Sequence, residues 1–320
     1  MLVIAICLRK GALMKSRIIQ LLAVLSLLWL TGCLEFEDQT LTYRYDAKTD
    51  TLRIFQDYHG IYGAKDKSQL EDEEITQLDS VLKGQRTFFF NNWVSEFDKE
   101  RLKELLGELK DPVKRKEGNE PEAVLVANEK LLMLAIDNVS VVNGRFYVDA
   151  KGRLSATQRV TVTQVSRLVA AGNGAISEAL KVEAAKDSNS SEDKASILKA
   201  LQGPADFIRL EGNVLTVHFP MPRGEFDKTL TDEDSGARQW REFKRQGGKV
   251  SYANGQGTWT FGSPTDTATI LTLPVFVGPY VTNAVAEVRK RAGIVEKFDA
   301  SAAAKEFVNS SAASAIQKKR

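Results

Sequence analysis

Residues 139–148 read VSVVNGRFYV, and this stretch says most about the fold. Its two β-prone arms, 139–142 and 145–148, flank Asn143-Gly144, a pair that readily adopts the positive φ angles of a type I′ turn. We therefore expect a β-hairpin with a two-residue turn here. The turn-forming residues 149–152 and the β-prone stretch 159–165 extend this hairpin to a three-stranded meander.

Further strands and helices are expected on both sides of this stretch. Alternating apolar residues predict two more hairpins, 40–45 with 51–56 and 207–210 with 214–219, and single strands at 258–261 and 269–277. Apolar residues at helical spacing predict amphipathic helices over 70–82, 90–109, 122–136, 168–183, 192–201 and 281–292. A strand is the alternative for 122–136, and an interruption is expected at Gly172-Asn173-Gly174 in 168–183. The sequence therefore predicts an α+β fold, in which antiparallel hairpins and a meander alternate with amphipathic helices.

Domain boundaries are indicated by composition. Residues 187–193, DSNSSED, have no apolar side chain to bury, so they are a possible linker. They would separate an N-terminal α+β part, 33–186, from a C-terminal α+β part, 194–300, although the two parts could also form one domain. Residues 301–320 are rich in Ala and Ser, and we expect a weakly helical or disordered tail.

The first 32 residues have the layout of a secretory signal peptide. Lys15 and Arg17 precede the apolar run 18–30, which is interrupted only by Gln20 and Ser26. As a helix this run would span about 20 Å, at roughly 1.5 Å per residue, whereas a bilayer core needs about 30 Å. A cleavable segment is therefore expected rather than a permanent span, with translation starting at Met14.

The residues that end this segment resemble the lipobox of bacterial lipoproteins. The motif is Leu30-Thr31-Gly32-Cys33, and the resemblance implies that the cysteine carries the lipid and becomes the first mature residue. It also implies a bacterial membrane location facing the periplasm or the exterior, held by two or three acyl chains, which give stable attachment. Leu34 stands where an Asp would favour inner-membrane retention in enteric bacteria, so the resemblance slightly favours the outer membrane. An ordinary signal peptide is the alternative.

Removal of residues 1–32 would change the charge balance and the cysteine content. It would leave 40 basic and 42 acidic residues, so the basic character of the whole chain belongs to the leader. A nucleic-acid partner is not expected, because such proteins keep a strong positive charge. Cys33 would be the only cysteine, which excludes a disulfide framework and a cysteine-based metal site.

The two histidines of the mature chain are the first candidates for catalysis. His59 follows Asp57, which could orient its ring, and His218 lies in the predicted strand 214–219. Neither histidine is accompanied by a nucleophile elbow or a His-x-x-x-His pair. We therefore predict no catalytic residue, although a triad assembled from distant residues stays open.

Two other motifs come close to cofactor or metal signatures. Gly172-Asn173-Gly174 begins like a dinucleotide-binding loop, but the third glycine is replaced by Ser177. The acidic run 232–234 is followed by Gly236 and Ala237, which do not fit an EF-hand loop. No cofactor and no metal site are therefore predicted.

Aromatic residues provide the remaining candidates for binding. Phe88, Phe89, Phe90, Trp93 and Phe97 lie within ten residues, and Phe90, Trp93 and Phe97 recur at helical spacing. They would form either a core face or a patch for a partner. Trp259 follows Gly255-Gln256-Gly257 and could stack on a ligand or lie in a half-buried strand.

These observations predict a lipid-anchored protein of the bacterial envelope with a non-catalytic binding or scaffold role. Its partners would be the membrane, through the lipid on Cys33, and an envelope protein. The alternatives are an envelope hydrolase that uses scattered histidine and carboxylate residues, and a receptor for a small ligand with a pocket between the two halves.

Overall fold

The polypeptide folds into two compact units, each with its own antiparallel sheet. The structure, a computed structural model, describes residues 34–63, 70–83, 99–111, 115, 120–185, 191–231, 237–265, 268–274, 283–291, 294–295 and 297–310. Of the described residues, those within 99–139 and 164–264 belong to the first unit, and those within 34–83, 140–163 and 265–310 belong to the second. Both units combine helices with antiparallel strands, so the predicted α+β fold is confirmed.

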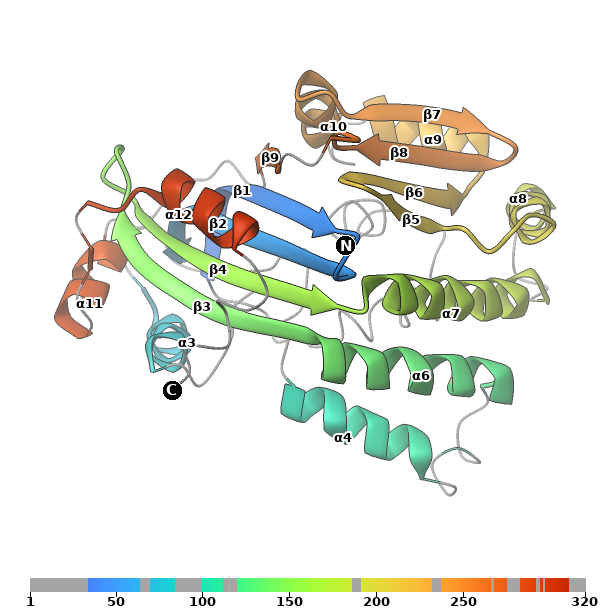
Figure 1. Cartoon of the computed structure of the whole chain (residues 1–320), viewed down its shortest axis with the longest axis horizontal. Coiled ribbons are helices and arrows are strands. Elements are labelled where there is room, and N and C mark those ends of the chain that lie inside the picture. The colour runs from blue at the N-terminus through green and yellow to red at the C-terminus, as the bar shows by residue number, and fades with distance from the viewer. Residues whose placement is uncertain are drawn as a thin grey trace. The chain divides into compact units, whose positions relative to one another are not determined.

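The second unit is built on a five-stranded sheet (Figure 1). Its strand order is β3-β4-β2-β1-β9, formed by β1 (Leu34–Asp46), β2 (Thr51–Gly63), β3 (Val139–Val148), β4 (Leu154–Thr163) and β9 (Thr269–Pro274). The predicted hairpin of 40–45 with 51–56 is β1 and β2, which pair from Leu34↔Gly63 to Asp46↔Thr51. In its turn, the Asp46 carboxylate accepts hydrogen bonds from Lys48 N and Thr49 Oγ1.

The expected turn at Asn143-Gly144 is wrong. Both residues lie inside the continuous strand β3, and neither has a positive φ. Gly144 is needed for close approach instead, because a Cβ there would lie 2.1 Å from Thr157 Oγ1 and 2.9 Å from Thr157 O. The chain reverses at 149–153, where Asp149 Oδ1 accepts from Lys151 N and Arg153 N. The expected three-stranded meander is therefore one long hairpin, β3 with β4.

Helices pack on both faces of this sheet. Tyr58 and Ala156 face α3 (Asp72–Leu82) and α11 (Asn283–Arg291) in the main core of this unit. Phe55 points to the opposite face, because side chains alternate along a strand, and it packs against Ala304 and Val308 of α12 (Ala300–Asn309). Residues 301–309, which we expected to be weakly helical or disordered, thus belong to a docked helix, and residues 311–320 lie outside the described residues.

The structure does not divide into the two sequential parts that the sequence suggested, because each unit combines separated segments of the chain. Strand β9 pairs with β1, so residues from the C-terminal part complete the N-terminal sheet. The possible linker 187–193 falls within the first unit, whose segment 164–264 continues on both sides of it. Residues 191–193 already belong to α8 (Ser191–Leu201).

The first unit contains a four-stranded sheet, shown with its helices in Figure 1. Its strand order is β5-β6-β8-β7, formed by β5 (Ile208–Glu211), β6 (Val214–Pro220), β8 (Gln256–Phe261) and β7 (Lys249–Ala253). The hairpin of β5 with β6 and the strand at 258–261 agree with the sequence prediction. Two helices, α9 (Arg223–Thr231) and α10 (Ala237–Arg245), supply aromatic side chains to its core.

The other helices of this unit are α4 (Lys99–Lys110), α6 (Glu122–Asn138), α7 (Val165–Ala185) and α8. The expected interruption at Gly172-Asn173-Gly174 is wrong, because α7 runs through it. The Asn173 side chain donates to Ile208 O at 2.9 Å and accepts from Ile208 N at 2.8 Å. These bonds fix α7 to the start of β5. This tertiary contact outweighs the low helix propensity of the two glycines.

Candidate functional site

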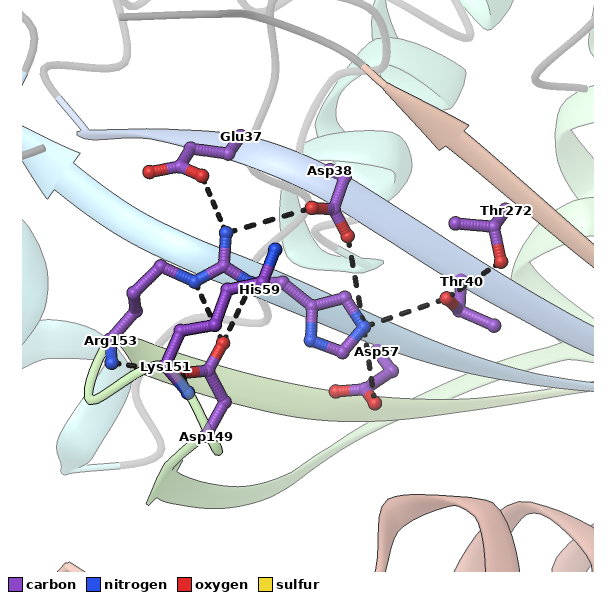
Figure 2. A network of polar contacts seen from close by, with 9 residues as sticks. All are labelled: Glu37, Asp38, Thr40, Asp57, His59, Asp149, Lys151, Arg153 and Thr272. Atoms are coloured by element: carbon purple, nitrogen blue, oxygen red, sulfur yellow. Dashed lines mark hydrogen bonds and ion pairs between the residues drawn. The ribbon is translucent and has the colours of Figure 1, made fainter. Parts of the chain in front are cut away.

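A cluster of polar side chains lies on one face of the five-stranded sheet (Figure 2). The β1–β2 register places Asp38 opposite His59 and Thr40 opposite Asp57. Strand β9 adds Thr272 beside Thr40. Because directly opposed residues of neighbouring strands project to the same side, the pairing alone brings these groups together.

The His59 ring is at the centre of this cluster. Its Nε2 atom lies 3.4 Å from Asp57 Oδ2, 3.5 Å from Thr40 Oγ1 and 3.9 Å from Asp38 Oδ1. The Thr40 hydroxyl also lies 3.0 Å from the Thr272 hydroxyl. The His59 side chain is half-buried.

Asp57 forms the buried side of the cluster. Tyr147 of β3 donates its hydroxyl to Asp57 Oδ1 at 2.7 Å. Burial raises the pKa of Asp57 to about 6, against the opposing effects of His59 and Tyr147. Burial likewise raises the pKa of Tyr147 above its ordinary value, and the neighbouring Asp57 raises it further. Tyr147 is therefore a permanent donor, whereas Asp57 can exchange a proton near neutral pH.

Arg153 forms the other end of the network, as Figure 2 shows. Its buried guanidinium donates to Glu37 and to Asp149, and lies 3.7 Å from Asp38 Oδ2. Burial acts to raise the pKa of Asp149, but hydrogen bonds from Arg153 and its charge outweigh that effect and lower the pKa. This end is a satisfied ion-pair network that joins β1 to the β3–β4 turn.

The geometry does not match the arrangement of a catalytic triad. A catalytic triad needs the acid on one imidazole nitrogen and the nucleophile on the other. Here both carboxylates and the Thr40 hydroxyl approach the same atom, Nε2. Ser155, paired with His59 across β2 and β4, is fully buried and has no access to a substrate.

The predicted site residues have different outcomes. Cys33, Phe90, Trp93 and Phe97 lie outside the described residues. Trp259, considered for ligand stacking, is only 1% exposed and lies in the aromatic core of the small sheet. Its ring centroid is 5.6 Å from that of Trp240 and 5.9 Å from that of Phe226. Strand alternation places Trp259 on the inner face, which corrects the ligand-stacking interpretation.

His218 belongs to the small sheet, so the two histidines are in different units. Its Nδ1 lies 3.0 Å from Thr258 Oγ1 on the neighbouring strand. Burial lowers its pKa, which favours the neutral ring. These contacts describe a strand histidine, in agreement with the sequence interpretation.

Sequence reasoning selected His59 and Asp57 but missed Asp38, Thr40 and Arg153. The sequence contained enough information to place Asp38 and Thr40, because the turn at 46–50 fixes the register of the β1–β2 hairpin. Extending that register along both strands places Asp38 opposite His59. Arg153 arrives from β4, whose pairing partner the local sequence does not specify.

No known family model, curated protein or solved structure matches the chain. Within the described ranges, no group of three or more His, Cys, Asp and Glu side chains is arranged to hold a metal ion. None of the helices that the structure describes is both long enough and apolar enough to cross a membrane.

Proposed function

We propose that the protein is a lipid-anchored component of the bacterial envelope with a non-catalytic binding or scaffold role. The observation that carries this proposal is the motif Leu30-Thr31-Gly32-Cys33 directly before β1, which begins at Leu34. A lipid on Cys33 would anchor the chain to the membrane directly before β1, which lies between β2 and β9 in the sheet. The folded unit would then work at the membrane surface, with the outer membrane favoured by Leu34.

The geometry around His59 supports the non-catalytic part of the proposal. Its three polar neighbours converge on one nitrogen, and Thr40 is held by Thr272. The cluster joins β1, β2 and β9 and so has a structural use that needs no substrate. A binding role would then belong to another surface, with an envelope protein as the partner.

A hydrolase of the envelope is the second candidate, favoured by one observation. Asp57 is a buried carboxyl whose pKa is raised by burial to about 6, beside a half-buried histidine. Groups of this kind concentrate at sites of acid–base catalysis. Asp57 and His59 would exchange the proton, and Asp38 would orient the ring.

In-cell cross-linking separates these two functions. Wild type, Cys33→Ser and His59→Gln are expressed at equal levels and cross-linked, and captured proteins are identified by mass spectrometry. The proposal predicts one abundant envelope partner that is captured by wild type and His59→Gln but lost from Cys33→Ser. Capture of no specific protein, together with hydrolysis of envelope material by wild type but not His59→Gln, would favour the hydrolase.

A further inference from the structure

Two arginines oppose each other on the face of the five-stranded sheet that α12 covers. Arg44 of β1 and Arg53 of β2 are direct partners in the hairpin register. Both project to the side of Phe55, which lies two residues from Arg53 and packs on α12. Like charges placed directly opposite on neighbouring strands repel each other, so this pair calls for a compensating negative charge.

The structure supplies little compensation to these arginines. Arg53 is only 5% exposed, and its guanidinium makes no hydrogen bond or ion pair with any described residue. Arg44 donates from one Nη to Asn309 Oδ1 at 2.7 Å, but its buried Nε has no acceptor in the described part of the chain. Burial lowers the pKa of Arg53; the charge of Asp46 opposes this effect, and that of Arg44 adds to it.

Elsewhere the same sheet pairs a buried guanidinium fully. Arg153 is about as buried as Arg53, yet it is surrounded by the carboxylates of Glu37, Asp38 and Asp149. An unpaired buried charge is costly, because it loses hydration without gaining a partner. The contrast with Arg153 leaves the Arg53 guanidinium without a comparable set of carboxylates among the residues that the structure describes.

The C-terminal end of α12 is too weak to act as that partner. Asn309, which contacts Arg44, is the last residue of α12. The end of a helix carries the equivalent of roughly half a negative charge, against two full positive charges on the arginines. Arg159, paired with Phe55 and lying over the Phe307 ring, adds a third positive charge nearby.

We propose that Arg44 and Arg53 form a binding site for a phosphate group. The planar guanidinium matches phosphate oxygens with parallel N–H donors. A phosphate monoester carries about 1.5 to 2 negative charges at neutral pH, which balances two arginines, whereas a carboxylate carries only one. The phosphate belongs to a soluble phosphorylated molecule or to a phospholipid headgroup, and both present the same chemistry to the site.

Thermal unfolding in phosphate tests this site. The purified mature protein is unfolded in inorganic phosphate and in chloride at equal pH and ionic strength. Phosphate is expected to raise Tm in a saturable manner, by about 5 °C at a hundredfold excess over Kd. Arg53→Gln and Arg44→Gln should lose this rise, whereas Arg209→Gln, an exposed arginine of the small sheet, should keep it. Equal Tm values in the two salts for wild type, or a full response in Arg53→Gln, would overturn the proposal.

A second variant distinguishes loss of the binding site from loss of the fold. Arg53→Met replaces the unpaired cation with a hydrocarbon chain of similar length, so its Tm in chloride should equal or exceed that of wild type. A lower Tm would mean that the Arg53 charge is already compensated within the chain, which contradicts the proposal.

Vesicles identify the source of the phosphate. Sedimentation of Cys33→Ser and Cys33→Ser/Arg53→Met is compared on phosphatidic acid and phosphatidylcholine vesicles. Arg53-dependent sedimentation with phosphatidic acid assigns the site to a lipid headgroup. Its absence, with the phosphate response intact, assigns the site to a soluble molecule.

Discussion

Asp57 shows how one residue links the sheet to solution pH. It is the buried carboxyl between Tyr147 and His59, and its pKa of about 6 lies above the ordinary 3.8. A carboxyl with a raised pKa binds its proton more tightly in the folded than in the unfolded state. Its contribution to stability is therefore complete below about pH 3.8 and is lost as the pH rises through about 6.

Asp57→Asn tests this linkage, because the amide keeps an acceptor for Tyr147 but does not titrate. The free energy of unfolding of wild type, relative to the variant, should increase by at most about 3 kcal/mol between pH 7 and pH 4. Urea unfolding of both proteins across this range measures the difference. A difference that is constant with pH, or that falls on acidification, would show that burial does not control this carboxyl.

The candidate site could be predicted only in part at this scale. His59 and Asp57 are neighbours in sequence, and their types alone made them candidates. Asp38 depends on the hairpin register, and Arg153 on the pairing of β2 with β4. The lack of a hydrogen-bonded acid at Arg53 among the described residues has no sequence signature, because it depends on which charges the fold places nearby.

At the scale of elements, helix α7 contains two glycines at positions where the surrounding structure has room for a larger side chain. A Cβ at Gly172 or Gly174 would meet nothing within 4 Å. Alanine restricts the unfolded chain and favours the helix, so Gly172→Ala and Gly174→Ala should each stabilise the protein by about 0.5–1 kcal/mol. Chemical denaturation measures the gain, and destabilisation by either change would contradict the described helix.

Gly144 in β3 should respond in the opposite direction. A Cβ there meets both the hydroxyl and the backbone oxygen of Thr157, so the strands must separate. Gly144→Ala is expected to cost about 1–3 kcal/mol, as for other overpacked sites. Amide exchange in β3 and β4 should accelerate. Unchanged stability and exchange would instead favour the Asn-Gly turn that the sequence suggested.

These two elements show where sequence patterns succeed and fail. Alternation and helical spacing located most strands and helices, because these patterns reflect which faces are buried. Glycine was misinterpreted in both β3 and α7, because it serves turns, close contacts and open helix positions alike. Its role depends on the neighbouring strand or helix, which the local sequence does not contain.

At the scale of the whole molecule, each unit is assembled from separated segments. Strand β9 completes the sheet begun by β1, and α12 returns to pack on Phe55. A composition-based linker cannot reveal such pairings, because they join residues more than 200 positions apart. Sequential halves were therefore the wrong description of the fold.

The docking of α12 can be tested through Val308, which is 1% exposed against Phe55. Val308→Ala should destabilise the protein by about 2 kcal/mol through lost burial and increase amide exchange across residues 300–309. Lys305→Ala, at an exposed position of the same helix, is the matched control and should change little. Equal behaviour of the two variants would contradict the docked position.

The most direct test of the central claim is fatty-acid labelling of the protein in cells, followed by mass spectrometry of its mature N-terminus. The lipid-anchor proposal predicts a mature chain that begins at Cys33 and carries acyl chains there. Cys33→Ser should lose both the label and the membrane association. Undiminished labelling of Cys33→Ser, or an unmodified Cys33 in the membrane-associated wild type, would contradict the proposal.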